Sequence, residues 1–322
     1  MYKFRLFTII ATAAIFLACE KDSTEHLQKG LTIEATQVST RTSFNGNKTS
    51  WVTGDEMKIM VGKDDAAPNA THLFTCENGE TGRFCNGEIL YNPEVAYDFY
   101  AVYPATATTE LNDIVARITI GAETQTQNGT DPNHIAALDP LTGYAKGLYP
   151  DKVSIPMSHN AAVLVVNIAN DLGQELAGIK SLTITADNGI ALCGKYDIDI
   201  VNGTLSNVTN TSSSVTVGVT NSGNISSNGE FKVYAAIAPC TLPNNATLKF
   251  TVTDTNDTIY ELTKAFPDGR TIVASDLLST TVRLAEAEAI TYNADFTIEQ
   301  GGIPTSLTKT ENTYIYNGKK VK

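Results

Sequence analysis

Short strand-like segments separated by turn residues run along most of the chain, and they constrain the fold more than any other feature. They are rich in Val, Ile, Thr and Tyr, which favour strands, and almost no segment beyond residue 30 has helical periodicity. The clearest segments are residues 71–74, 97–102, 114–120, 153–155, 162–168, 181–185, 195–200, 215–219, 231–236, 247–252, 258–262 and 278–283. Many short strands with regular turns are typical of antiparallel β-sandwiches. The sequence therefore predicts an all-β fold.

The length of 322 residues favours two domains of roughly 150 residues each. Hydrophobic residues make up 42% of the chain, which is enough for two cores. We expect the boundary near residues 149–151, between a long segment without periodicity and a fresh strand. The sequence thus predicts an N-terminal β-sandwich over 31–151, a C-terminal β-sandwich over 152–290 and a tail over 291–322. Residues 161–168 are apolar on both faces and predict a central strand.

The N-terminus has the pattern of an export signal. A positively charged start and an apolar run over residues 6–17 are typical of a signal peptide, and the run is too short to span a bilayer. It ends in the sequence FLAC, which resembles a bacterial lipobox and whose last residue is Cys19. We expect a lipoprotein signal peptide over 1–18, membrane attachment through a lipid such as palmitate on Cys19, and a charged tether over 19–30. The alternative is a cleaved secretory peptide with an incidental cysteine.

The segment after the tether opens with a candidate strand at residues 31–35, where apolar and polar side chains alternate. A polar linker at 39–43 follows and contains Arg41, in a setting exposed enough for a trypsin-like protease. A second strand pattern begins at residue 56. One interpretation is that proteolysis can remove the first strand from an otherwise complete sheet. The alternative is an ordinary first strand followed by an ordinary loop.

Four cysteines follow Cys19, two in each half of the chain. Cys76 and Cys85 flank a turn-rich stretch, and in a hairpin centred on residues 80–81 they would lie directly opposite one another. An exported protein can form disulfides, so the sequence predicts candidate bridges Cys76–Cys85 and Cys193–Cys240. The alternative is four free thiols.

The charge and the motifs favour neither nucleic-acid binding nor catalysis. A formal net charge of −12 without an internal basic cluster disfavours contact with phosphate backbones. The four histidines are scattered, so we expect no metal site, no cofactor and no catalytic residue. His159, just ahead of a strand, is expected to be a packed edge histidine. We therefore expect that the chain is not an enzyme.

Several short motifs occur together in one order along the chain. After Cys19 they are TRT at 40–42, WVTGD at 51–55, YDFYAVYP at 97–104, DPLTGYA at 139–145, VSIPMSHNAAV at 153–163 and FPDGR at 266–270. In this order the chain resembles the fimbrillin family of type V pilins and related surface lipoproteins. The resemblance implies two tandem transthyretin-like β-sandwich domains. It also implies export as a lipoprotein to the cell outer membrane, in a surface pilus (fimbria) whose partners are other pilin subunits.

In polymerising members, the resemblance further implies cleavage of the N-terminal strand after a basic residue, which by position would be Arg41. A C-terminal segment of the next subunit would then fill the vacated groove by strand addition. The donor candidates are Phe296, Ile298, Tyr314, Ile315 and Tyr316. The motifs do not separate stalk, tip and anchor subunits. The alternative function is a monomeric surface lipoprotein that binds a glycan or another ligand.

Overall fold

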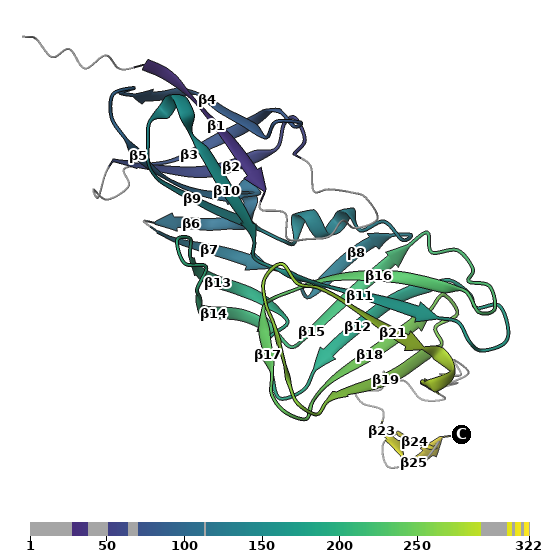
Figure 1. The fold of residues 1–322 in the computed structure, drawn as a ribbon. Helices are drawn as coiled ribbons and strands as arrows, with labels where there is room; N and C mark the ends of the chain where they lie inside the picture. Colours follow the sequence, from purple (N-terminus) through teal and green to yellow (C-terminus); the bar gives the residue numbers. More distant parts are fainter. Residues whose placement is uncertain are drawn as a thin grey trace, which may run out of the picture. The chain divides into compact units, whose positions relative to one another are not determined.

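The computed structural model describes residues 28–37, 51–63, 70–112 and 114–290, together with three short strands between residues 308 and 321. Strands dominate these residues, and the longest helical segment among them is the five-residue 3-10 turn η2 (Asn133–Ala137). The predicted all-β fold is confirmed (Figure 1). Within the described residues, no helix has the length and apolar character needed to cross a membrane.

The chain divides into two compact units. The first contains residues up to 119, residues 139–160 and residues 195–209, and the second contains 120–138, 161–194 and the residues from 210 onward. The expected boundary after residue 151 lies near the crossing at 160–161. The further exchanges of segments between the two halves were not expected from the sequence.

The strands of the first unit close into a barrel in the order β1-β10-β9-β5-β2-β3-β4. They are β1 (Gln28–Gln37), β2 (Glu56–Lys63), β3 (Ala70–Asn78), β4 (Arg83–Tyr91), β5 (Tyr97–Tyr103), β9 (Leu141–Leu148) and β10 (Ser154–His159). Alternate side chains of these strands point inward, as the period of a strand requires. The core that they form contains Leu31, Ile33, Trp51, Met57, Ile59, Phe74, Phe84, Phe99, Leu141, Ile155 and Met157.

A smaller sheet has the order β14-β13-β7-β6. Its strands are β6 (Thr108–Asn112), β7 (Val115–Ile120), β13 (Cys193–Asp199) and β14 (Leu205–Ser212). The Arg117 guanidinium on β7 donates two hydrogen bonds to the Asp197 carboxylate on β13, at 2.7 and 3.0 Å. This charged pair joins neighbouring strands that lie 80 residues apart in the sequence.

Two sheets enclose the core of the second unit. One has the order β16-β11-β21 and the other β22-β19-β18-β12-β15-β8. Their strands are β8 (Thr124–Asn128), β11 (Ala162–Ala169), β12 (Ile179–Ala186), β15 (Ser214–Thr220), β16 (Glu230–Ile237), β18 (Ala246–Asp254), β19 (Ile259–Phe266), β21 (Leu277–Arg283) and β22 (Glu288–Ile290). A short hairpin pairs β17 (Cys240–Leu242) with β20 (Arg270–Ile272). The predicted central strand is confirmed, because β11 lies between β16 and β21.

The C-terminal tail contains a separate three-stranded sheet, β23-β24-β25. Its strands are β23 (Thr308–Thr310), β24 (Thr313–Tyr316) and β25 (Lys319–Val321). β24 pairs with β23 on one side and with β25 on the other. The donor candidates Tyr314, Ile315 and Tyr316 therefore lie in a strand, and Phe296 and Ile298 lie outside the described residues.

Candidate assembly site

β1 is inserted between two strands of the first unit and completes the barrel. It pairs antiparallel with β4, where Ile33 lies opposite Phe84, and parallel with β10, where Ala35 lies opposite Ile155. The amide of Ala35 also donates to the Gly82 carbonyl at 2.8 Å. If β1 were removed, β4 and β10 would be left about 10 Å apart, twice the usual strand spacing, with both facing edges unpaired.

The inward face of β1 fills the core of the first unit. Leu31, Ile33 and Ala35 are 1%, 0% and 2% exposed, whereas the intervening Glu34 is exposed. Burial of Leu31 and Ile33 contributes roughly 1.5–3 kcal/mol for each side chain. Without β1, the gap between β4 and β10 would be an apolar groove with positions for three inward side chains two residues apart.

Trp51 secures the C-terminal part of β1. Its indole Nε1 donates to the Ala35 carbonyl oxygen at 2.9 Å, and its ring packs edge-on against Phe84 and Tyr103 with centroid distances of 5.0 and 4.8 Å. At Gly82, which has a φ of +64°, a Cβ atom would collide with the Ala35 carbonyl and the indole ring. The β3–β4 turn therefore needs glycine there to admit both Trp51 and the end of β1.

Arg41 comes between β1 and Trp51 in the sequence and lies outside the described residues. The consequence of a cut at this position follows from the order of the segments along the chain. Cleavage after Arg41 would separate the polypeptide that carries β1 from the polypeptide that carries Trp51, β4 and β10. After the cut, β1 would be held only by non-covalent contacts.

Within the described residues, no pairing joins an expected donor residue to β1. Cys19, Phe296 and Ile298 lie outside the described residues. Tyr314, Ile315 and Tyr316 lie in β24, where the backbone of Ile315 pairs with Thr308 on β23 and with Lys320 on β25. Within the described pairings, β24 therefore belongs to the tail's own sheet.

The expected register of the first cysteine pair was wrong. Cys85 lies opposite Thr75, and Cys76 lies opposite Phe84, because the β3–β4 register shifts between Cys76 and Asn78. A shift of one residue sends the two side chains to opposite faces of the sheet. Cys76 is buried in the core, whereas the Cys85 Sγ lies 3.4 Å from the Thr32 Oγ1.

All four of these cysteines are free thiols in the structure, Cys193 and Cys240 included. Burial raises the pKa of Cys76 and of Cys193, and it raises the pKa of Cys240 to about 11. A raised pKa keeps a thiol protonated and weakly nucleophilic at neutral pH. The buried thiols therefore act as small apolar core side chains.

His159 is a packed histidine, as expected. It is buried at the end of β10, where its Nδ1 lies 2.6 Å from the Asp139 Oδ2. Next to it, both the amide and the Nδ2 of Asn160 donate to the Pro140 carbonyl, at 3.0 and 2.9 Å. These contacts fasten the start of β9 to the end of β10. In the described part of the chain, no three His, Cys, Asp or Glu side chains lie close enough to hold a metal ion.

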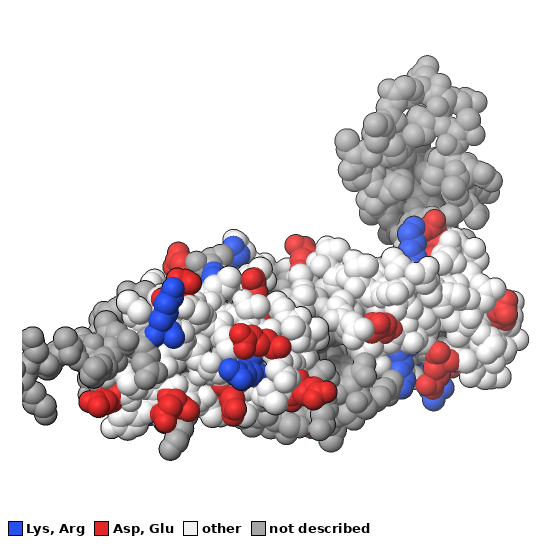
Figure 2. Space-filling view, turned by 90° about the horizontal axis from the view of Figure 1, so that it is seen from above, with Lys and Arg blue, Asp and Glu red and all other residues white. Residues whose placement is uncertain are grey.

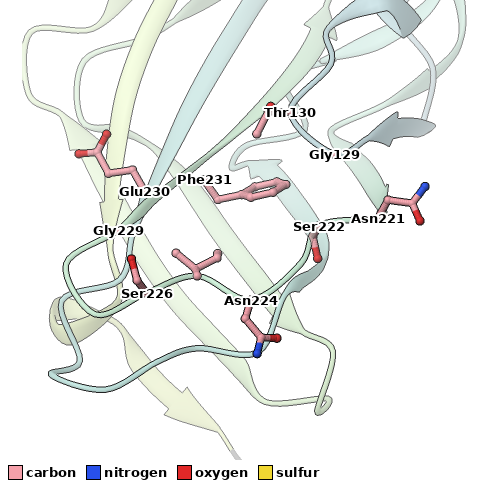
Figure 3. A pocket seen from close by; sticks show the side chains of 10 residues that line it. Gly129, Thr130, Asn221, Ser222, Asn224, Ser226, Gly229, Glu230 and Phe231 are labelled. Atoms are coloured by element: carbon pink, nitrogen blue, oxygen red, sulfur yellow. The ribbon is translucent and has the colours of Figure 1, made fainter.

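A polar cavity of about 360 Å³ opens on the second unit (Figure 3). Its one aromatic lining residue, Phe231, is buried and offers no free ring face on which a sugar could stack. The Asn224 amide is already bonded to Glu175 at 2.9 Å and the Asn221 amide to Asn128 at 2.9 Å. The cavity therefore does not favour the ligand-binding alternative.

Charged side chains are scattered over the described surface that Figure 2 shows, and Lys and Arg do not gather into a patch there. Phosphate backbones are held by clustered basic side chains. This face therefore offers no such cluster, and the absence of a nucleic-acid partner stays a prediction.

The sequence matches a family model described as Fimbrillin-like over residues 36–315. Two solved structures share the fold. One is from Bacteroides ovatus and was proposed to act in cell adhesion; it is 15% identical, with a TM-score of 0.54, and the match covers 82% of this chain and 96% of that one. The other, from Bacteroides uniformis with the same proposed role, is 20% identical, with a TM-score of 0.51, covering 81% and 95%. No curated protein matches the sequence.

Proposed function

We propose that this chain, which belongs to the fimbrillin-like family, is a structural or adhesive subunit of a cell-surface fimbria. The matched residues, 36–315, include every sequence motif beyond the lipobox that carried the resemblance. Membership in this family also agrees with the expectation that the chain is not an enzyme. The cell surface is accordingly its place of action, and other fimbrial subunits are its partners.

We further propose that subunits join by strand exchange at the position of β1. The observation that carries this proposal is the insertion of β1 between β4 and β10, with its only onward connection running through the segment that contains Arg41. A strand at the free edge of an open sheet would leave no groove when removed. A strand inserted between two others leaves two facing backbone ladders and an apolar floor, which is the acceptor that strand addition requires.

The incoming strand would come from the tail of another copy or of a related subunit. It must supply apolar side chains two residues apart, to replace Leu31 and Ile33 in the core. Phe296 and Ile298 have this spacing, and so do Tyr314 and Tyr316. Ile315, between the two tyrosines, would point away from the core if Tyr314 and Tyr316 pointed inward.

Membrane attachment is proposed to occur through a lipid on Cys19, after removal of residues 1–18. Residues 19–27 would then space the first unit from the outer membrane, because β1 already begins at Gln28 and shortens the tether expected over 19–30. In this arrangement, a cut after Arg41 would also detach the subunit from its lipid, because Cys19 and β1 would remain on the same fragment.

The proposal is tested by cleaving the purified precursor with a trypsin-like protease that is specific for arginine, and following assembly. We expect a product that begins at Thr42 and a ladder of oligomers on a gel run without boiling. Arg41→Gln should abolish both, whereas the matched change Lys48→Gln, in the same segment, should leave both intact. A product that begins at Thr42 and stays monomeric would contradict strand exchange.

A further inference from the structure

The β16 strand of the second unit has one edge that is not paired with another strand. It is the terminal strand of the β16-β11-β21 sheet and, at eight residues, it is long enough to accept another strand. An exposed edge with unpaired N–H and C=O groups is a template for pairing with a second chain. The partners of these groups therefore decide whether the second unit can take up a strand.

Two glutamine side chains occupy this edge. The Gln125 Oε1 accepts from the Ala236 amide at 3.0 Å, and its Nε2 donates to the Ala236 carbonyl at 2.8 Å. The Gln127 Oε1 accepts from the Tyr234 amide at 2.8 Å, and its Nε2 donates to the Lys232 carbonyl at 2.7 Å. Each side-chain amide thus offers one acceptor and one donor to the edge, as a residue of a neighbouring strand would.

Two further outward groups of the same stretch are also paired. The His134 Nε2 lies 3.0 Å from the Tyr234 carbonyl, and it must donate because a carbonyl only accepts. Burial lowers the pKa of His134, which keeps the ring neutral. The Ala238 amide donates to the Leu192 carbonyl at 2.7 Å.

The position of the two glutamines in β8 explains how they reach the edge. β8 belongs to the other sheet, where it pairs with β15, and residues two apart in a strand point to the same face. Gln125 and Gln127 are 2% and 0% exposed, although a glutamine is rarely buried to this degree. Such burial is tolerated only because both the oxygen and the nitrogen of each side chain have partners.

We propose that Gln125, Gln127 and His134 act as a side-chain strand that seals the β16 edge and directs strand exchange to the position of β1 in the first unit. The sealing stands on the hydrogen bonds above, and only its role in directing exchange rests on the proposed function. At the position of β1, the edges of β4 and β10 are paired with the backbone of β1, which can leave after a cut. At β16, the side chains that cover the edge belong to β8 and η2, which remain part of the folded chain.

The test uses the full, uncleaved chain with Gln125→Met and Gln127→Met, singly and together. Methionine keeps the length and volume of glutamine but has no amide. The control is Gln174→Met, at an exposed position of the same unit. Hydrogen exchange, measured at low protein concentration, should be about fivefold faster at the Tyr234 and Ala236 amides of the double variant than in wild type, since one hydrogen bond contributes about 1 kcal/mol.

Sedimentation at increasing concentration should then show a dimer of the double variant, while the wild type and Gln174→Met stay monomeric. Unchanged exchange at Tyr234 and Ala236, or faster exchange without any association, would overturn the proposal. If the double variant does not fold, the same two readouts on Gln127→Met decide the outcome. None of these samples is cleaved at Arg41, so they test the seal at the β16 edge by itself. A failure of the cleaved wild type to assemble would contradict the proposed function without contradicting the seal.

Discussion

The indole Nε1 of Trp51 donates a hydrogen bond of 2.9 Å to the carbonyl oxygen of Ala35. This bond joins the two sides of the segment that contains Arg41, because Ala35 belongs to β1 and Trp51 begins the next described segment. The bond therefore persists after a cut in that segment and must break when β1 leaves. Trp51 is thus a latch on the strand that we propose to be exchanged.

Removal of the Trp51 N–H should loosen β1 specifically. Trp51→Phe keeps an aromatic ring but leaves the Ala35 carbonyl without its donor, so the free energy of unfolding should fall by about 1–3 kcal/mol. Urea unfolding measures this loss, and hydrogen exchange should be faster along β1. Val52→Ala is the control, because Val52 is 62% exposed and its truncation should change stability by less than about 0.5 kcal/mol. Equal stability of Trp51→Phe and wild type would show that the hydrogen bond from Trp51 to Ala35 does not hold β1 in place.

The two faces of β1 should differ sharply in their tolerance of truncation. Ile33→Ala leaves a cavity in the core of the first unit and should cost about 2–5 kcal/mol of unfolding free energy. Glu34→Ala, one residue further on the exposed face, should cost less than about 0.5 kcal/mol. Urea midpoints of the two variants give the comparison. Similar losses at the two positions would mean that β1 is not packed as the structure shows.

The pair formed by Arg117 and Asp197 should make stability depend on acid pH. Hydrogen bonds from Arg117 and Asn207 lower the pKa of Asp197 in the folded protein below the reference value of 3.8. The unfolded chain therefore binds a proton more readily, so the stabilisation is complete above about pH 4–5 and is lost as the pH falls through the lowered value.

Asp197→Asn tests this dependence. It should be less stable than wild type at pH 7, and the difference should shrink at pH 3, as measured by urea unfolding at both values. Asp257→Asn is the control, because the ion pair of Asp257 with Lys180 is largely exposed and such pairs contribute little. A constant difference between Asp197→Asn and wild type from pH 7 to pH 3 would exclude a lowered pKa at this site.

The register at the β3–β4 hairpin predicts which thiol reacts first. Cys85 lies on the outer face and is half-buried, whereas Cys76 and Cys193 are buried. Iodoacetamide should therefore label Cys85 in the native protein before it labels Cys76 or Cys193, as peptide mass mapping would show. Recovery of a Cys76–Cys85 bridged peptide from a non-reduced digest would refute the observed register.

Local patterns in the sequence identified strands well, because burial of one face imposes a period of two. The alternation of Leu31, Ile33 and Ala35 predicted β1 and its inward face, and the apolar run at 161–168 predicted the central strand β11. The neighbours of β1 were not predictable, since Phe84 and Ile155 lie about 50 and 120 residues away and no local pattern selects them.

Other features were missed because they arise from tertiary structure alone. The bulge near Cys76 shifts the register by one residue, and nothing in the turn sequence gives the shift. Gln125 and Gln127 alternate with threonine, so β8 has no apolar face that would indicate burial. The sequence signal for a strand here is the strict alternation of Thr and Gln over residues 124–127, because a loop has no such period.

Locking β1 in place tests most directly whether β1 must leave before subunits join. Thr32 lies opposite Cys85 across β1 and β4, so Thr32→Cys would put two thiols at a cross-strand position where Cα atoms are usually about 4.5–5.5 Å apart, within the range of a disulfide. After cleavage at Arg41, we predict that the oxidised variant stays monomeric and that dithiothreitol restores assembly, while Thr32→Ser assembles in both conditions. Equal assembly of the oxidised and reduced Thr32→Cys protein would contradict strand exchange at β1.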